Sequence, residues 1–191
     1  MDTGEFLTKV FLPSKTLAKR PSTVRGYEIH VRKYLVPELG EIPLDRLDYE
    51  HIQGCIARVP GSAASQHRVL ATLKSALSMA VKLRKIQYNP AVGIQLEPEN
   101  PAEAQRWTPA QARQFIEKTA DDRMGLMLRV AVRKGVRRGE LVGLRWENWS
   151  AKERSFTLSS TLLQFGGKLT DDTPKTKAVS GRSTSARRLR G

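Results

Sequence analysis

The stretch from Lys134 to Trp146 reads KGVRRGELVGLRW and places two adjacent arginines, Arg137 and Arg138, at the start of an apolar, helix-forming run. A planar guanidinium can donate two parallel hydrogen bonds to one phosphate, whereas a lysine offers only a point charge. Held in place before a reaction and shielded from water, such a group stabilises a transferring phosphoryl group by about 3 kcal/mol per well-placed donor. The stretch therefore predicts a phosphate-binding arginine at Arg137.

A second interpretation of the same residues involves no chemistry. Arg137 and Arg138 can be solvated residues at the start of a helix, and Glu140 a first-turn acid that the helix dipole favours. In the phosphate-binding interpretation, Gly135 and Gly139 are expected to let the backbone approach closely. The composition of the rest of the chain favours the phosphate-binding interpretation.

Composition and charge indicate a polyanionic partner. The 191 residues can form one large or two small domains, and their 33 Lys and Arg against 19 Asp and Glu give a formal charge of +14 and a pI near 10.3. Nucleic acid is the first candidate, although an anionic membrane or ribosomal RNA would satisfy the same balance. The single cysteine, Cys55, excludes an intramolecular disulfide and a cysteine-based zinc site and favours a reducing cytosol. The sequence has no long apolar run and no signal peptide, so no membrane association is expected. No metal or other cofactor is expected either.

A regular helical domain is predicted over residues 20–98. Ser22 or Thr23 can cap a first helix that continues to Leu35. A second helix is predicted from about Asp48 to Val59, and a third from about Ser62 to Arg84. The apolar stripe of this third helix consists of Leu70, Leu73, Leu77, Ala80 and Val81.

The basic side chains expected to contact nucleic acid lie mainly in this domain. Any one of them is explained well as a solubilising surface charge, but that explanation is weak for the whole set. The set consists of Arg25, Arg32, Lys33, Arg68, Lys74 and Lys82, together with Arg138.

Two segments outside the helical domain are assigned no fold of their own. Residues 1–19, an apolar patch cut by Pro13, are predicted to be an amino-terminal extension. Residues 99–106 mix proline and charge without periodicity and are predicted to be a linker.

A second domain is predicted over residues 107–178, with Thr108 as a helix cap and Pro109 as the first helical residue. Two helices precede the arginine-containing stretch, and strands joined by a turn near Gly166 follow it. Residues 179–191, rich in Ser, Arg and Gly, are predicted to be a disordered basic tail.

Three motifs resemble the phage-type tyrosine recombinases, or integrases. Residues 135–146 match the pattern G-hydrophobic-R-x-G-E-L-x-x-L-x-W of the first arginine box of that family. Residues 21–90, from PSTVRGY to NP, resemble its helical core-binding domain, and WTPAQ at 107–111 resembles the opening of its catalytic domain.

The resemblance implies a fold and a set of roles. The fold would be mainly α, with a helical, SAM-like core-binding domain followed by a partial α+β integrase catalytic domain that contains a short β-hairpin. Arg137 would bind the scissile phosphate of DNA. Lys175, in the PKTKA run at 174–178, would act as the general acid toward the leaving 5′ oxygen.

The resemblance ends after Ala178. Integrases continue with a His-x-x-Arg box and a tyrosine nucleophile, whereas this sequence has no histidine after His67 and no tyrosine after Tyr88. The catalytic set is incomplete, so the chain is interpreted as a truncated or frameshifted copy, and whether it is an enzyme stays open.

The resemblance implies a duplex-DNA-binding protein of DNA integration and recombination in a mobile element, unable to cleave DNA alone. Its expected partners are double-stranded DNA and other recombinase protomers, without a small-molecule substrate, in the cytoplasm of a bacterial or phage-infected cell. The alternative is a non-enzymatic DNA-binding accessory or competing factor at recombination sites. An RNA-binding or ribosomal protein is supported by charge alone.

Overall fold

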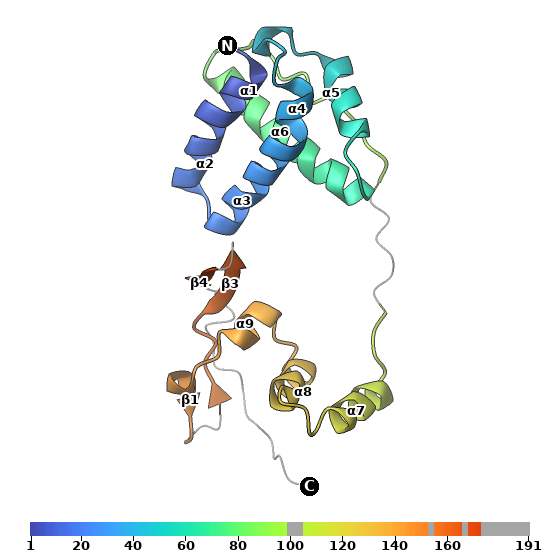
Figure 1. Ribbon diagram of the computed structural model, residues 1–191, viewed down its shortest axis with the longest axis vertical. Coiled ribbons are helices and arrows are strands. Elements are labelled where there is room, and N and C mark those ends of the chain that lie inside the picture. Colours follow the sequence, from blue (N-terminus) through green and yellow to red (C-terminus); the bar gives the residue numbers. More distant parts are fainter. Residues whose placement is uncertain (99–104, 153–154, 166–167, 173–191) are drawn as a thin grey trace. The chain divides into compact units, whose positions relative to one another are not determined.

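The computed structural model describes residues 1–98, 105–152, 155–165 and 168–172. The chain divides into two compact units, residues 1–102 and 103–191. The described part of the first unit is helical, and that of the second combines helices with two small antiparallel sheets (Figure 1). The expectation of a mainly α fold, followed by a partial α+β unit, is confirmed.

Two continuous helical segments, two further α-helices and a short 3₁₀-helix make up the described part of the first unit. Residues at the internal junctions, such as Leu12 and Val36, keep right-handed helical angles, so a π-helical turn lies inside each continuous segment. In chain order the elements are α1 (Thr3–Glu5), η1 (Phe6–Phe11), α2 (Leu12–Ala18), α3 (Pro21–His30), η2 (Val31–Leu35), α4 (Val36–Leu39), η3 (Leu44–Arg46), α5 (Tyr49–Ala57) and α6 (Ala63–Lys82).

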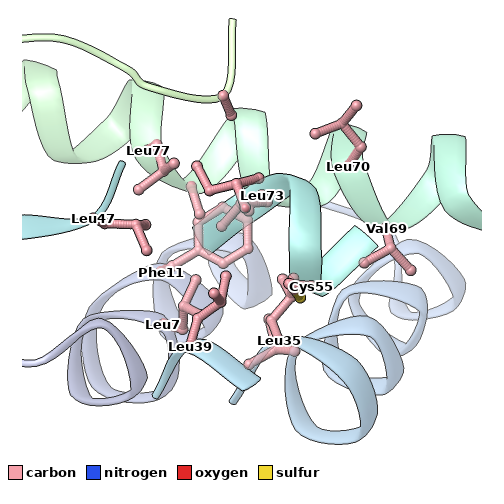
Figure 2. Close-up of a cluster of buried hydrophobic side chains, with 14 of the residues drawn as sticks. Leu7, Phe11, Leu35, Leu39, Leu47, Cys55, Val69, Leu70, Leu73 and Leu77 are labelled. Carbon is pink, nitrogen blue, oxygen red and sulfur yellow. The ribbon is translucent and has the colours of Figure 1, made fainter. Parts of the chain in front are cut away.

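The first helical segment contributes to the core through buried residues between Thr3 and Leu12, which corrects the expectation of a separate extension. Phe6, Leu7 and Phe11 are fully buried in the same apolar cluster as the side chains of α6. In Figure 2 the Phe11 ring lies among labelled leucines from several helices. Pro13 does not end the segment, because it lies at the second residue of α2, within the continuous helix.

The amino-terminal helix is also held by hydrogen bonds. The backbone N–H and the hydroxyl of Thr3 both donate to the carbonyl of Ile42, at 2.9 and 2.8 Å. The N–H of Gly4 donates to the carbonyl of Gly40 at 3.0 Å. A Cβ at Gly4 would stand 3.0 Å from Gly40 Cα, so the two backbone segments are in close contact here.

Helix α6 supplies the longest apolar face of the core. Four of the five side chains predicted for its stripe are buried, and Val81 is only half-buried. Asp48 caps α5 by accepting a hydrogen bond from the N–H of His51 at 2.9 Å. At the start of α3 the predicted caps are wrong: Arg20 is the capping residue and Pro21 the first helical one, because proline needs no N–H partner there.

The end of α6 contains a strained residue. The N–H of Arg84 donates to the carbonyl of Val81 and that of Lys85 to Ala80, both at 2.9 Å, which is the usual closure of a helix by a left-handed residue. Arg84 is that residue, with φ of +56°. Glycine normally occupies this position, since a side chain there costs about 1–2 kcal/mol.

The second unit begins with helices and continues into short strands. Its elements are α7 (Pro109–Lys118), α8 (Gly125–Lys134), α9 (Arg138–Val142), η4 (Trp146–Asn148), β1 (Trp149–Ser150), β2 (Ser155–Phe156), β3 (Thr161–Phe165) and β4 (Lys168–Asp172). Strand β1 pairs with β2, and β3 with β4, both antiparallel. The predicted capping of α7 is confirmed, because Thr108 Oγ1 accepts from Gln111 N at 3.3 Å and Gln111 Oε1 accepts from Thr108 N at 2.8 Å.

We expect residues 1–98 to fold alone and residues 20–98 to fail to fold. Removing residues 1–19 deletes four buried apolar side chains, and each contributes about 1.5–3 kcal/mol. The loss is comparable with the whole stability of an ordinary domain, about 5–15 kcal/mol. Circular dichroism during urea unfolding measures it, and a cooperative transition of residues 20–98 would contradict the placement of the first helix in the core.

Arg84→Gly is expected to stabilise the first unit by about 1 kcal/mol, because glycine adopts a positive φ without the clash of a Cβ. Arg84→Ala is the matched control, since alanine removes the same guanidinium but keeps the strain. Urea unfolding of residues 1–98 compares the three proteins. An equal gain from alanine would show that the charge, and not the backbone angle, is responsible.

Candidate phosphate-binding site

The site lies where α8 ends and α9 begins. Gly135 closes α8 in the left-handed conformation, with φ of 63°, and its N–H donates to the carbonyl of Ala131 at 2.9 Å. A Cβ at Gly135 would have nothing within 4 Å, so the backbone angle and not close approach requires glycine here. The expectation of close approach at Gly135 is therefore corrected.

At Gly139 the expectation of close approach is confirmed. A Cβ there would stand 2.6 Å from Thr161 Cγ2 and 3.2 Å from the carbonyl oxygen of Leu162. Gly143, one turn later on the same side of α9, would place a Cβ 2.8 Å from the carbonyl oxygen of Ser160. The Ser160 hydroxyl donates to the carbonyl of Gly143 at 3.1 Å. Two glycines thus set α9 directly on the start of β3.

Arg137 is the residue that caps α9, and Glu140 holds it. The backbone N–H of Arg137 donates to Glu140 Oε2 and its Nη1 donates to Oε1, both at 2.9 Å. The carboxylate is buried, whereas the side chain of Arg137 is 69% exposed. One end of the guanidinium is therefore fixed against the protein while most of the side chain meets solvent.

The charge state of Glu140 follows from these contacts. The hydrogen bond from the backbone N–H of Arg137, then the hydrogen bond and charge of its guanidinium, lower the pKa of Glu140, and burial opposes them. The carboxylate is ionised at neutral pH. Because the main-chain N–H holds one oxygen, the carboxylate keeps a partner even when the guanidinium also binds an anion.

Further basic residues surround this turn. Arg138 is the first residue of α9 and is exposed, and Arg133 and Lys134 are exposed at the end of α8. Cations at the carboxyl end of a helix are also favoured by its dipole. The turn between α8 and α9 therefore carries a concentration of positive charge around Arg137.

The other residues predicted to bind nucleic acid belong to the first unit, and most are exposed there. Lys33 Nζ lies 5.4 Å from the centroid of the Tyr34 ring. Lys74 differs: its Nζ donates to the carbonyl of Ile94 at 3.2 Å, so it holds the chain that returns along α6. Exposed members of the set are Arg25, Arg32, Lys33, Arg68 and Lys82. Lys175 lies outside the described residues, as do residues 173–191.

Two features of the site were not predicted. Glu140 was interpreted as a first-turn acid, although its spacing of three residues from Arg137 could have indicated the contact. Gly143 carried a similar signal, because glycines four residues apart on a short helix indicate a face in close contact.

The described residues lack two kinds of feature. They contain no group of three or more His, Cys, Asp or Glu side chains placed to hold a metal ion. Within the same part of the chain, no helix combines the length and the apolar character that crossing a membrane requires.

Comparison with known proteins places this architecture. No protein-family model matches the chain. An integrase of Saccharopolyspora erythraea is 31% identical over 152 residues, which are 76% of this chain and 35% of that relative. The Tn1549 transposon integrase in complex with circular intermediate DNA matches with a TM-score of 0.75 and 21% identity, over 94% of this chain and 62% of that one. A lambda integrase dimer bound to a COC′ core site matches with a TM-score of 0.71 and 17% identity, over 91% and 62%.

The fold is therefore the integrase fold, a helical unit followed by a unit of helices and short strands. The arginine-containing motif and the related sequence are likewise similar to those of the tyrosine recombinase, or integrase, family. It spans 35% of the length of the curated relative that it matches.

Glu140→Gln is expected to destabilise the second unit by about 1–3 kcal/mol at pH 7, because the hydrogen bonds from Arg137 lose a charged acceptor. Tryptophan fluorescence during urea unfolding isolates this unit, since all three tryptophans, at 107, 146 and 149, lie in it.

The difference in unfolding free energy between Glu140→Gln and the unsubstituted chain is also expected to depend on pH. The pKa of Glu140 is lowered in the folded chain, so its contribution is complete above the ordinary value of 4.5 and is lost as pH falls through the folded value. The difference between Glu140→Gln and the unsubstituted chain should be constant near neutral pH and shrink below pH 4.5. A difference that grew on acidification would contradict the ionised, hydrogen-bonded carboxylate.

Proposed function

We propose that this chain binds duplex DNA as part of a tyrosine recombinase of DNA integration and recombination, with Arg137 binding a backbone phosphate. The observation that carries the proposal is the side chain of Arg137, which is 69% exposed and whose guanidinium is held at one end by the buried carboxylate of Glu140. A guanidinium has five N–H donors, so the contact with Glu140 leaves others for an anion.

The geometry favours a positioned phosphate contact over a solvated surface charge. A free arginine side chain loses about 2 kcal/mol of rotamer entropy when it is fixed, and the contact with Glu140 meets part of that cost before DNA binds. Arg138, Arg133 and Lys134 add positive charge around the same turn, which attracts a phosphate backbone at long range.

The proposed partners are double-stranded DNA and other recombinase protomers. The formal charge of +14 supports the first, because neutralising phosphates releases counterions and supplies most non-specific affinity. The Tn1549 transposon integrase in complex with circular intermediate DNA and the lambda integrase dimer bound to a core site support both by likeness of fold. The proposed location is the cytoplasm, on DNA.

Strand cleavage by these 191 residues alone is not part of the proposal. All four tyrosines, at 27, 34, 49 and 88, lie in the first unit, whereas the nucleophile of the family belongs to the catalytic domain. The proposed role of Lys175 as general acid stays a prediction, and the polypeptide is proposed to bind DNA without forming a covalent adduct.

The test is the affinity for a short duplex, measured by fluorescence anisotropy at several salt concentrations. The logarithm of the affinity should fall linearly with the logarithm of the salt concentration, and each phosphate contact should contribute about −0.9 to the slope. Arg137→Ala should cost about 1–3 kcal/mol, and Arg137→Lys should recover only part of that loss because lysine cannot donate two parallel hydrogen bonds.

Arg113→Ala is the matched control, because it removes an exposed arginine from α7 of the same unit. It should reduce affinity much less than Arg137→Ala. Equal losses of affinity in the two variants would show that Arg137 acts as an ordinary surface charge. An affinity that did not change with salt concentration would contradict the proposal of DNA binding.

A further inference from the structure

His30, which is not among the residues predicted to contact nucleic acid, joins α3 to α6 through a buried hydroxyl. Its Nδ1 lies 2.7 Å from the Oγ1 of Thr72, a residue that is 2% exposed. The Thr72 hydroxyl also lies 3.0 Å from the carbonyl oxygen of Arg68, one turn earlier on α6, and donates its proton there.

These two contacts together favour one tautomer of the ring. When the single proton of the hydroxyl is donated to the Arg68 carbonyl, which can only accept, the Thr72 oxygen accepts from His30. The neutral imidazole therefore carries its proton on Nδ1 and its lone pair on Nε2. Within the described residues, Nε2 of His30 has no hydrogen-bond partner.

The surroundings of the ring are cationic. Arg68 is exposed on α6, and its positive charge is the one that acts on the imidazole. Burial first, and then this charge, lower the pKa of His30 below its ordinary value of 6.5, so the ring is neutral at pH 7. On the same helical segment, the neighbouring charged residues Glu28 and Lys33 are exposed. Helix α2 contributes Lys15, whose Nζ lies over the rings of Phe11 and Tyr27.

We propose that His30 Nε2 and the guanidinium of Arg68 together bind one backbone phosphate of duplex DNA, and that His30 takes up a proton from solvent as it binds. The inference rests on the proposed DNA binding and adds a contact in the first unit. A phosphate placed between the two groups offsets the repulsion that Arg68 exerts on a protonated ring, because it attracts both, and it accepts a hydrogen bond from the newly protonated Nε2.

Thr72 is a positioning residue in this arrangement. It does not reach the phosphate, but it holds Nδ1 as a donor and thereby leaves Nε2 as the nitrogen that gains a proton. The bound ring then has both N–H groups satisfied, one by Thr72 and one by phosphate. A histidine without such a partner would be free to present either nitrogen.

Proton uptake makes the affinity depend on pH in a defined direction. The free ring has the lower pKa and the bound ring the higher one, so affinity rises as pH falls through the bound value and levels off below the free value. Between the two values, the affinity should change by up to about tenfold for each pH unit, as one proton requires.

The experiment measures the affinity of the full chain for a short duplex between pH 5 and 8 at constant ionic strength. The unsubstituted chain should bind more tightly as pH falls, and His30→Gln should lose most of that dependence and about tenfold in affinity at the acid end. Arg68→Ala should weaken binding at all pH values. The chain has three histidines, so His51→Gln and His67→Gln are matched controls that should keep the dependence.

The first part of a second measurement uses only the unsubstituted chain and so does not depend on how a variant folds. Proton NMR of the His30 ring in the unsubstituted chain should show its pKa raised by duplex DNA, and Thr72→Val should reduce the rise. An unchanged pKa in the presence of bound duplex, or a pH dependence that survives in His30→Gln, overturns the inference. Loss of DNA binding at every pH would instead overturn the proposed function.

Discussion

Burial of the apolar face of α6 is the constraint on which the first unit depends. Its side chains share one apolar cluster with those of the amino-terminal helix and of the returning segment that contains Ala91 and Ile94. Each contact joins residues far apart in the chain, so no single helix of this unit would keep its position without the others. The basic residues on the outer surface are therefore displayed by a body that is rigid because of its core.

Local signals predicted most of the helices, because capping and periodicity are properties of neighbouring residues. Thr108 was recognised by a residue type that caps helices, and the stripe of α6 by its interval. The position of Phe6 to Leu12 could not be predicted in this way. A short apolar patch shows that something must cover it, but not which distant helix does so.

The same distinction applies to the candidate site. The role of Arg137 was suggested by its sequence context, and its contact with Glu140 is local enough to be read from their spacing. The hydrogen bond of Lys74 could not be predicted from the sequence, because helical periodicity indicates only that a lysine lies on the outer face. The Ile94 carbonyl comes within reach of its ammonium group only because of the path that the chain takes after α6. Gly139 and Gly143 likewise acquire their meaning from Ser160 and the strand that follows.

Gly139 and Gly143 also determine how α9 is stabilised. A helix of five residues, Arg138–Val142, has too few hydrogen bonds to be stable by itself, so its conformation depends on its contact with the start of β3. The position of Arg137 is then a property of the hairpin as much as of its own helix. Residues 160–162 therefore help to position the arginine, although they carry no charge themselves.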